Sequence, residues 1–358
     1  MRLVLILIMS ALVQYLPAQK LRVVVAGIDH GHVGWILSRH QDPLLDLVGV
    51  YSADTVLAKR YAKQYGFSEK LIYADLGKML DAVRPEAALA FGSVHSHLSV
   101  VEAAAPRGIH VMVEKPLAVS LDHAQKMQAL AKKHQIHLLT NFETSWYASA
   151  AKAYELVNDS AAVGTVRKVV VSSGHPGPKE IGCSPEFLAW LTDPVLNGGG
   201  AVMDFGCYGA NIMTRLMRGE RPTAVTAVTR QLKPQIYPKV DDDATIMVEY
   251  KTAHCIIQAS WNWPYHIKGM EIYGNKGFLL APDGKTLNRG TDRLDKTERV
   301  NTTEVPHYED PFLYLHDVIR GKLKPRDYDV YSLENNMLVM EILEKAKQSA
   351  RSGKRIPF

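Results

Sequence analysis

The feature of this sequence that most limits its possible folds is the apolar run at residues 109–113, IHVMV, which ends at Glu114-Lys115-Pro116. Apolar and polar residues do not alternate in the run, which is typical of a strand covered on both faces. Pro116 has no N–H group, so the chain must leave the sheet there. Glu114 and Lys115 are therefore expected at the carboxyl end of a central strand, where open α/β sheets bind their ligands.

Lys115 is the first candidate for acid–base chemistry. An ammonium group in surroundings of low dielectric is destabilised, so we expect its pKa to fall and its proton to exchange near neutral pH. The alternative is that Glu114 and Lys115 form a solvated pair in an ordinary strand-to-helix turn.

Strands and helices alternate through residues 20–140. This alternation predicts βαβ units and a doubly wound parallel sheet, an α/β fold. The strands are predicted at residues 21–26, 45–51, 87–91, 109–113 and 136–139, and the helices at residues 35–39, 58–65, 76–83, 97–105 and 121–134.

The pattern changes in residues 141–358. Successive strands there follow one another through short turns, which predicts an α+β domain with a mostly antiparallel sheet. The strands are predicted at residues 166–172, 223–232, 244–250, 254–261 and 270–273, the helices near 185–191, 200–217 and 333–349, and an irregular surface region at 286–309.

One face of this second sheet has no obvious covering helix. An uncovered apolar sheet face usually marks an interface, so we expect a homodimer or homotetramer. The residues expected on that face include Val225, Ala227, Thr229, Ile246, Val248 and Tyr250.

Length and charge narrow the class of protein. A chain of 358 residues fits two domains. The net charge of +5 is spread along the chain without a Lys/Arg block, so we expect no nucleic-acid partner. The three cysteines, at 183, 207 and 255, are too few and too far apart for a disulfide framework or a zinc knuckle.

Residues 1–18 have the order of a secretory signal. Arg2 precedes an apolar run, residues 3–13, that is too short to span a bilayer, and cleavage after Ala18 is expected. We therefore expect a periplasmic or secreted protein with no membrane anchor after processing. The alternative is a start at Met9, which would remove most of the run and leave a cytoplasmic protein.

A glycine-rich turn follows the first predicted strand. Gly27, Gly31 and Gly34 stand between that strand and a helix, the context of a dinucleotide-binding turn. Glycines permit close backbone approach, and the start of the helix attracts a pyrophosphate. The loop is one residue longer than the usual G-x-G-x-x-G, and it carries Asp29.

The second predicted strand ends at Ser52, with Asp54 two residues later. Asp54 is placed to reach a ribose. The lack of a carboxylate at position 52 equally leaves room for a 2′-phosphate near Lys59 or Arg60. NAD and NADP both remain open.

Two H-x-H pairs lie at predicted strand ends, His30/His32 and His95/His97. Such pairs can ligate zinc, but no carboxylate or cysteine set accompanies them in the sequence. We therefore expect no metal site, and we interpret these histidines as hydrogen-bonding to phosphates or backbone, His97 at the cofactor among them.

The segment at residues 197–211, NGGGAVMDFGCYGAN, predicts a helix with an unusual polar stripe. Asp204, Tyr208 and Asn211 share one face, and Arg215 follows them. Solvated helix faces favour Lys and Glu, whereas Asp, Tyr and Asn among glycines indicate the wall of a cleft.

In their order along the chain, the glycine turn, the strand before His97, Glu114-Lys115-Pro116 and GGGAVMD resemble the Gfo/Idh/MocA family of sugar dehydrogenases. The resemblance implies an N-terminal Rossmann domain, a C-terminal domain whose open sheet makes dimers, and often a cis bond before Pro116. It also implies that Lys115 lies beside the nicotinamide, with Asp204 and Tyr208 across the cleft.

These features together predict an NAD(P)-dependent oxidoreductase that acts on a sugar or polyol. Lys115 and Tyr208 would share the proton of the substrate hydroxyl, and Asp204 would orient the substrate. The alternatives are a redox glycosidase with tightly bound NAD, and a ligand-binding relative without catalysis. The expected cofactor contacts are Gly27, Gly31, Gly34, Ser52, Asp54, His97 and Glu114, and the expected substrate contacts are Asn211, Trp146, His175 and Trp263.

Overall fold

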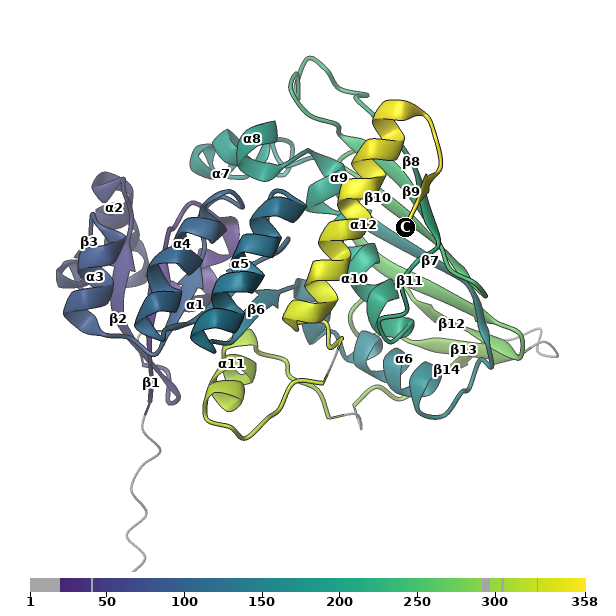
Figure 1. Cartoon of the computed structure of the whole chain (residues 1–358), viewed down its shortest axis with the longest axis horizontal. Helices are drawn as coiled ribbons and strands as arrows, with labels where there is room; N and C mark the ends of the chain where they lie inside the picture. The colour runs from purple at the N-terminus through teal and green to yellow at the C-terminus, as the bar shows by residue number, and fades with distance from the viewer. Residues whose placement is uncertain (1–19, 40, 292–296, 304–305, 327) are drawn as a thin grey trace, which may run out of the picture.

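The computed structural model describes residues 20–39, 41–291, 297–303, 306–326 and 328–358. The predicted signal segment, residues 1–18, lies outside the described residues. Figure 1 shows two sheets side by side, with helix α12 (Leu333–Ser352) between them. Among the described residues, no helix combines the length and the apolar character needed to cross a bilayer.

The first sheet is the predicted doubly wound one. Its six strands are all parallel in the order β3-β2-β1-β4-β5-β6. The order reverses between β1 and β4, so the carboxyl ends of these strands form the crevice in which such sheets bind ligands. The strands are β1 (Leu21–Ala26), β2 (Leu45–Tyr51), β3 (Ile72–Tyr73), β4 (Ala87–Ala90), β5 (His110–Glu114) and β6 (Leu138–Asn141). The helices between them are α1 (Gly34–Leu37), α2 (Thr55–Tyr65), α3 (Leu76–Val83), α4 (Ser96–Ala104) and α5 (Leu121–His134).

The second sheet has nine strands in the order β14-β13-β12-β11-β7-β10-β9-β8-β15. Only β7 and β10 pair in parallel, so the predicted mostly antiparallel sheet is confirmed. The strands are β7 (Val166–Gly174), β8 (Ala224–Arg230), β9 (Asp243–Glu249), β10 (His254–Ser260), β11 (Ile267–Gly274), β12 (Gly277–Ala281), β13 (Asn288–Thr291), β14 (Glu298–Arg299) and β15 (Ile356–Pro357). The helices are α6 (Ala148–Asn158), α7 (Pro185–Leu191), α8 (Pro194–Asn197), α9 (Ala201–Asp204), α10 (Gly206–Leu216), α11 (Pro311–Ile319) and α12.

The prediction for residues 286–309 was partly wrong. Strands β13 and β14 lie in this segment and extend the edge of the sheet beyond β12. Their residues are polar and largely exposed, so they lack the apolar alternation by which strands are recognised.

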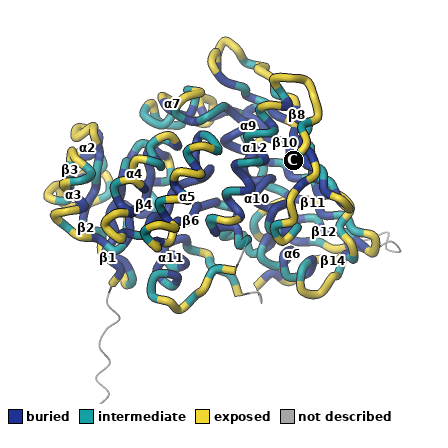
Figure 2. Tube along the Cα trace, in the orientation of Figure 1, coloured by how far each residue is buried: buried dark blue, intermediate teal, exposed yellow. Residues whose placement is uncertain are grey.

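Helices α10 and α12 form the core between the two sheets. Helix α10 packs on β7 and β10, while α12 packs on α10 and β8 on one side and on α5 and β6 on the other. Figure 2 shows this central region as predominantly buried. Helix α12 therefore contacts both domains and fixes how they face each other.

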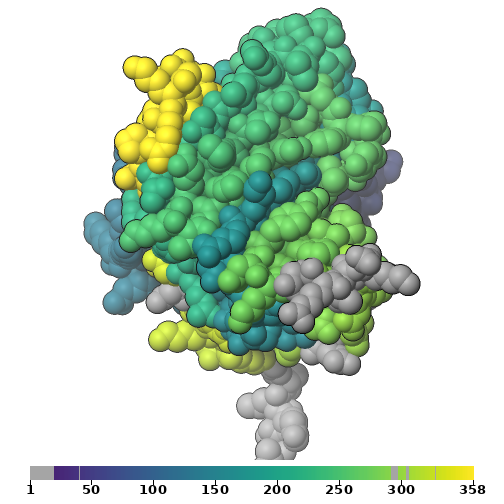
Figure 3. Space-filling view, turned by 90° about the vertical axis from the view of Figure 1, so that its right-hand side faces the viewer, coloured from purple at the N-terminus to yellow at the C-terminus, as the bar shows by residue number. Residues whose placement is uncertain are grey.

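The prediction of which residues lie on the uncovered face of the second sheet was wrong. The alternate residues of the same strands lie on that face. Val225, Ile246 and Val248 are fully buried, because they point toward α10 and α12. Successive strand residues point to opposite faces, so choosing the wrong alternate set exchanges the two faces completely. Figure 3 shows the side of the molecule on which the strands of this sheet lie at the surface. The alternate residues of these strands are partly or fully exposed, and they include Val170, Thr226, Val228, Thr245, Met247 and Ile256.

Candidate active site

Lys115 lies where β5 ends, as predicted, and its side chain is 7% exposed. Its ammonium nitrogen donates a hydrogen bond to the backbone oxygen of Asp204 at 3.0 Å and forms an ion pair with the Asp204 carboxylate. The peptide bond between Lys115 and Pro116 is cis, in agreement with the family resemblance. The ion pair joins the last residues of a strand in one domain to a helix end in the other.

The predicted fall in the pKa of Lys115 is wrong. Burial does lower the pKa of this ammonium group, but the charge and hydrogen bond of Asp204 outweigh burial, and the pKa rises above its ordinary value. The sequence showed the strand end but not the partner, which is 89 residues away in the chain. Lys115 is therefore a protonated group that can stabilise negative charge on an oxygen.

Asp204 is held on both of its carboxylate oxygens. One oxygen faces Lys115, and the other accepts a hydrogen bond from Nε1 of Trp261 at 2.9 Å. Burial alone would raise the pKa of Asp204, but the charge of Lys115 brings it down to about 2. Asp204 is thus an anion with a fixed orientation at neutral pH.

Tyr208 lies one turn after Asp204, on α10. The nitrogens of Lys115 and Lys268 lie 5.3 and 5.1 Å from the centre of its ring. Burial, and then the negative charge of Glu143, raise the pKa of Tyr208 well above its ordinary value, so the phenol stays protonated. Its hydroxyl has no hydrogen-bond partner within the part of the chain that the structure describes, which leaves it available to a ligand.

A cavity of about 270 Å³, here called the catalytic cavity, lies beside these groups. Phe205, whose ring centre is 5.8 Å from the Lys115 nitrogen, forms one wall. The predicted contact His175 lines the cavity, and burial lowers its pKa to about 4, so that its ring is neutral at pH 7. The remaining lining residues are Glu143, Tyr147, Gly174, His266, Ile267, Lys268, Pro282, Asp283 and Gly284.

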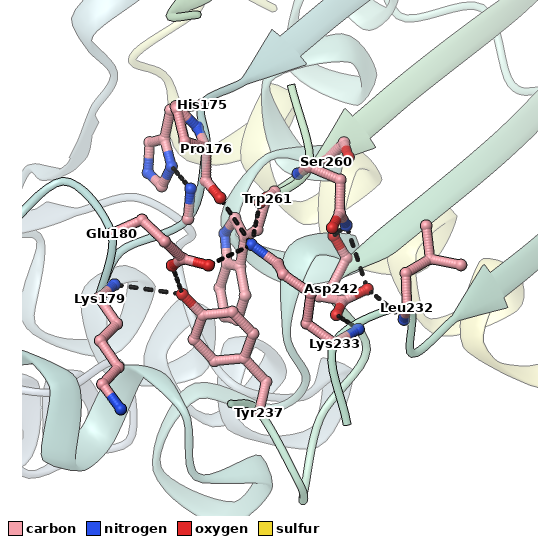
Figure 4. Close-up of polar contacts among 12 residues, drawn as sticks. His175, Pro176, Lys179, Glu180, Leu232, Lys233, Tyr237, Asp242, Ser260 and Trp261 are labelled. Atoms are coloured by element: carbon pink, nitrogen blue, oxygen red, sulfur yellow. Dashed lines mark hydrogen bonds and ion pairs between the residues drawn. The ribbon is translucent and has the colours of Figure 1, made fainter. Parts of the chain in front are cut away.

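A hydrogen-bond network around Lys233 holds the backbone of Trp261 (Figure 4). The side chain of Trp261 in turn holds Asp204. The ammonium nitrogen of Lys233 donates to the backbone oxygens of Pro176 at 2.6 Å and Trp261 at 2.8 Å. Its third contact is the Glu180 carboxylate at 2.5 Å, which also accepts from the Tyr237 hydroxyl. Lys233 thus ties the segment after β7 and the segment after β8 to the residue that holds Asp204.

Two of the predicted substrate contacts lie elsewhere. Asn211 is fully buried, and its side-chain nitrogen donates to the backbone oxygen of Val330 at 2.8 Å and to Asn335 at 3.1 Å. The prediction for Asn211 was wrong, because the face that it shares with Tyr208 turns from the cleft to α12 within one helical turn. Trp146 stacks on Tyr331 with ring centres 4.7 Å apart and does not line the catalytic cavity. Trp263 packs against Gly174, which does line that cavity.

The glycine turn brings the ends of β1 and β4 together. Gly27 has φ +86°, and a Cβ atom there would lie 2.7 Å from the Gly92 nitrogen, so only glycine fits. A Cβ at Gly31 would meet no atom within 4 Å, whereas one at Gly34 would meet the Tyr65 hydroxyl at 2.9 Å. The open space above Gly31 is the room that a dinucleotide needs for close approach to the backbone.

Ser52, Asp54 and His97, which were also predicted to contact the cofactor, make hydrogen bonds within the protein. Ser52 is buried and donates to the backbone oxygen of Asp54, whose carboxylate caps α2 by accepting from two backbone N–H groups at 2.9 Å. His97 lies beneath the Lys115-Pro116 turn, with Nδ1 3.1 Å from the Leu117 oxygen. Its Nε2 is buried without a hydrogen-bond partner among the described residues, and burial lowers its pKa to about 4.

Glu114 corrects the interpretation of the first histidine pair. The sequence showed no carboxylate near His30 and His32, but the ligand atoms of Glu114 and both histidines lie within 4.8 Å of one another. Nδ1 of His30 accepts from the His32 backbone at 3.0 Å, so the neutral ring carries its proton on Nε2 and is a donor. The predicted role as a hydrogen-bonding loop histidine is confirmed for His30.

The carboxylate of Glu114 is fully engaged. It accepts from the Asn141 side chain at 2.6 Å and lies 3.2 Å from Nδ1 of His32. Burial would raise the pKa of Glu114, but the interaction with His32 lowers it to about 2. The strand end therefore carries one fixed anion and one fixed cation, Glu114 and Lys115.

Several residues of the site were not identified from the sequence. Trp261, Glu143 and Lys268 come from three different elements and have no common spacing. The one signal for Trp261 was its position at the end of a predicted apolar strand. Long-range pairing of strands, which the sequence does not specify, brings these residues to the cavity.

Comparisons with known proteins identify the family and agree with the fold. Residues 21–142 match a family described as an oxidoreductase family with an NAD-binding Rossmann fold, and residues 150–280 match the GFO/IDH/MocA C-terminal domain. Trans-1,2-dihydrobenzene-1,2-diol dehydrogenase of Xenopus tropicalis is 26% identical, over 84% of this chain and 89% of that protein. Myo-inositol 2-dehydrogenase of Thermotoga maritima is 22% identical, over 94% of this chain and 98% of that protein.

A solved structure shows the same fold. The aldose-aldose oxidoreductase of Caulobacter crescentus superposes with a TM-score of 0.80 at 22% identity, over 95% of this chain and 100% of that one. The agreement extends over both domains.

Proposed function

Because the chain belongs to the Gfo/Idh/MocA family of NAD-binding oxidoreductases, we propose that it transfers a hydride between a nicotinamide cofactor and a sugar or polyol. The observation that carries the proposal is the buried ion pair of Lys115 and Asp204, with the Tyr208 phenol beside it. Phe205, next to Lys115, and Lys268, next to Tyr208, both line the catalytic cavity. The similar dehydrogenases named for a dihydrodiol and for inositol support a substrate with neighbouring hydroxyls.

The residues have complementary tasks in such a reaction. The nicotinamide, when bound, accepts or supplies the hydride. The Lys115 ammonium stabilises negative charge on the substrate oxygen, and Tyr208 donates a hydrogen bond to the same oxygen. Asp204 keeps Lys115 protonated and in place, and Trp261 keeps Asp204 in place.

The protonation states favour carbonyl reduction at neutral pH. With Lys115 and Tyr208 both protonated, a carbonyl oxygen that receives hydride at its carbon can take a proton at once. Alcohol oxidation instead requires the pair to accept a proton, so its rate should rise with pH. Measuring both directions across pH, with the purified protein and a panel of sugars and polyols, tests the function. Failure to change the nicotinamide absorbance in either direction, together with no ketone detected by mass spectrometry, would refute it.

We propose NAD rather than NADP as the preferred cofactor. Asp29 follows β1, Asp54 follows β2 and Glu186 lies on α7. Burial and the negative charges of Asp54 and Glu186 raise the pKa of Asp29. Arg60 is paired with Glu186 at 2.6 Å. This negative surrounding disfavours a 2′-phosphate. Titration of tryptophan fluorescence should give at least about tenfold tighter binding of NAD than of NADP.

We also propose that two or four chains associate through the open face of the second sheet. Val170, Met247 and Ile256 are apolar and partly exposed on this face, and no helix within the described ranges covers it. A monomer mass by light scattering at micromolar concentration would contradict this proposal.

Export remains a proposal that rests on residues 1–18. Their charged, apolar and small-residue regions have the order of a cleavable signal. N-terminal sequencing of protein from the native host should start at Gln19. An intact Met1 or Met9 on protein from the cytoplasm would overturn it.

A further inference from the structure

A second, larger cavity adjoins the catalytic cavity. This outer cavity has a volume of about 780 Å³ and shares Tyr147, Asp283 and Gly284 with the catalytic cavity. The catalytic cavity alone, at about 270 Å³, is below the usual range of roughly 300–1,000 Å³ for small-molecule sites. The smaller space suits a single ring, and the two together suit a longer molecule.

The three residues that line both cavities are held in place by specific contacts. The Tyr147 ring packs so closely on the Gly284 backbone that a Cβ at Gly284 would lie 2.8 Å from it. Ser149 donates two hydrogen bonds to Asp283 and Gly284. Its backbone N–H donates to the Gly284 oxygen at 3.1 Å, and its hydroxyl donates to the backbone oxygen of Asp283 at 2.7 Å. The Tyr147 hydroxyl donates to Glu143 at 2.7 Å, and Glu143 is paired with Lys268. The two cavities therefore share a boundary of fixed geometry.

The lining of the outer cavity has the chemistry of a carbohydrate subsite. Trp146 offers an aromatic surface, one face of which stacks on Tyr331. Nε1 of Trp146 is a donor without a partner among the described residues. Arg299 and Glu309 are exposed on the same cavity and offer a cation and an anion to hydroxyl groups. Aromatic faces combined with charged donors and acceptors suit sugar rings, which have apolar faces and polar edges.

We propose that the substrate is a glycoside of at least two units, with the reacting sugar in the catalytic cavity and the second unit in the outer cavity. This inference rests on the proposed oxidoreductase function and adds the substrate class. Contacts made by the second unit fix the position of the first, so they contribute to the rate and not only to binding.

The first test compares matched substrates. A panel of monosaccharides is assayed beside disaccharides and aryl glycosides that carry the same sugar at the non-reducing end, with products identified by mass spectrometry. The glycosides should have a kcat/KM at least about tenfold above that of the parent monosaccharide. A higher kcat/KM for disaccharides than for aryl glycosides would identify a sugar as the second unit. A higher kcat/KM for aryl glycosides would identify an aromatic aglycone. Oxidation of the intact glycoside and release of its aglycone both support the inference.

The second test uses Arg299→Ala. This residue is exposed and lines the outer cavity only, so the variant should lower the ratio of glycoside to monosaccharide kcat/KM by about fivefold to tenfold. Arg289→Ala is the matched control, because Arg289 is an exposed arginine on the neighbouring strand, pairs with Glu298 and does not line the cavity. Trp146→Ala should lower the same ratio, and Trp146→Phe should restore most of it.

The outcomes separate the inference from the function on which it rests. Monosaccharides turned over as well as their glycosides would overturn the inference and leave the oxidoreductase function standing. An equal change of the ratio in Arg299→Ala and Arg289→Ala would overturn it as well. Turnover of neither substrate class would refute the oxidoreductase function itself.

Discussion

The two sheets present their functional groups in different ways. The parallel sheet presents Glu114 and Lys115 at the end of β5, where the direction of the strand alone decides which residues reach the ligand. The second sheet presents its groups from one face, through β10, β11 and the helices packed on it. A strand end can be located from a break in the apolar pattern, whereas a face requires knowing which alternate residues point inward.

The largest effect is expected at the strand end. Lys115→Met keeps the length of the side chain but removes the charge that stabilises the substrate oxygen. We expect kcat to fall by about 10²- to 10⁴-fold, with cofactor binding nearly unchanged. Steady-state kinetics and fluorescence titration of NAD measure the two quantities. Turnover within a few-fold of the wild type would show that Lys115 is not at the reacting oxygen.

The two faces of the second sheet can be compared at neighbouring residues of β10. Ile257 is fully buried against Gly209 of α10, whereas Ile256 points to the open face. Ile257→Glu should cost at least about 4 kcal/mol of unfolding free energy, because it buries an unpaired carboxylate. Ile256→Glu should change the unfolding free energy of the monomer by about 0.5 kcal/mol or less but prevent association.

Urea unfolding and light scattering of both variants decide the comparison. Equal destabilisation by the two substitutions would show that both faces are covered. An unchanged oligomer in Ile256→Glu would move the interface elsewhere.

A substitution at Lys233 tests whether the network beside the second sheet affects catalysis through the orientation of Asp204. Lys233→Met removes the three hydrogen bonds that tie Trp261 to the two flanking segments. With Asp204 less well oriented, kcat should fall by about tenfold while KM changes little, and Lys233→Arg should recover part of the loss. Lys179→Met is the control, because Lys179 contributes only its backbone N–H to the network. A loss of stability without a change in kcat would make Lys233 a structural residue only.

A further effect concerns acid stability. The pKa of Asp204 is about 2 in the folded protein, below the ordinary 3.8, so its ionised form stabilises the fold above pH 4. This contribution, about 2 kcal/mol, should be lost as the pH falls from about 4 to 2. In Lys115→Met, burial without the cation should raise the pKa of Asp204 above 3.8. The variant should therefore be less stable than the wild type at neutral pH and should not show this loss between pH 4 and 2. Identical acid profiles for the two proteins would show that the pair does not contribute.

The sequence was sufficient to predict five of the six strands of the parallel sheet and the position of Lys115, because buried strands and their breaks are local features. It missed β3, which has only two residues, both partly exposed. It was also sufficient to group Asp204 and Tyr208, which share a helical face. It did not predict the pKa of Lys115, because the shift depends on contact with Asp204 from the other domain. The predicted locations of Asn211, Val225, Ile246 and Val248 were wrong, because all four are buried. Their residue patterns did not show which side of the helix or strand faces the core.

Helix α12 also constrains when the cleft can come into existence. The ribosome delivers the strands of both sheets except β15, including β6 and β8, before residues 333–352 emerge to cover them. Until then the apolar sides of α10 and β8 have no partner, and the contacts that close them join distant parts of the chain, which slows folding. The nascent protein therefore passes through a stage in which both domains have their strands but share no active site. During that stage, aggregation competes with the docking of a single helix.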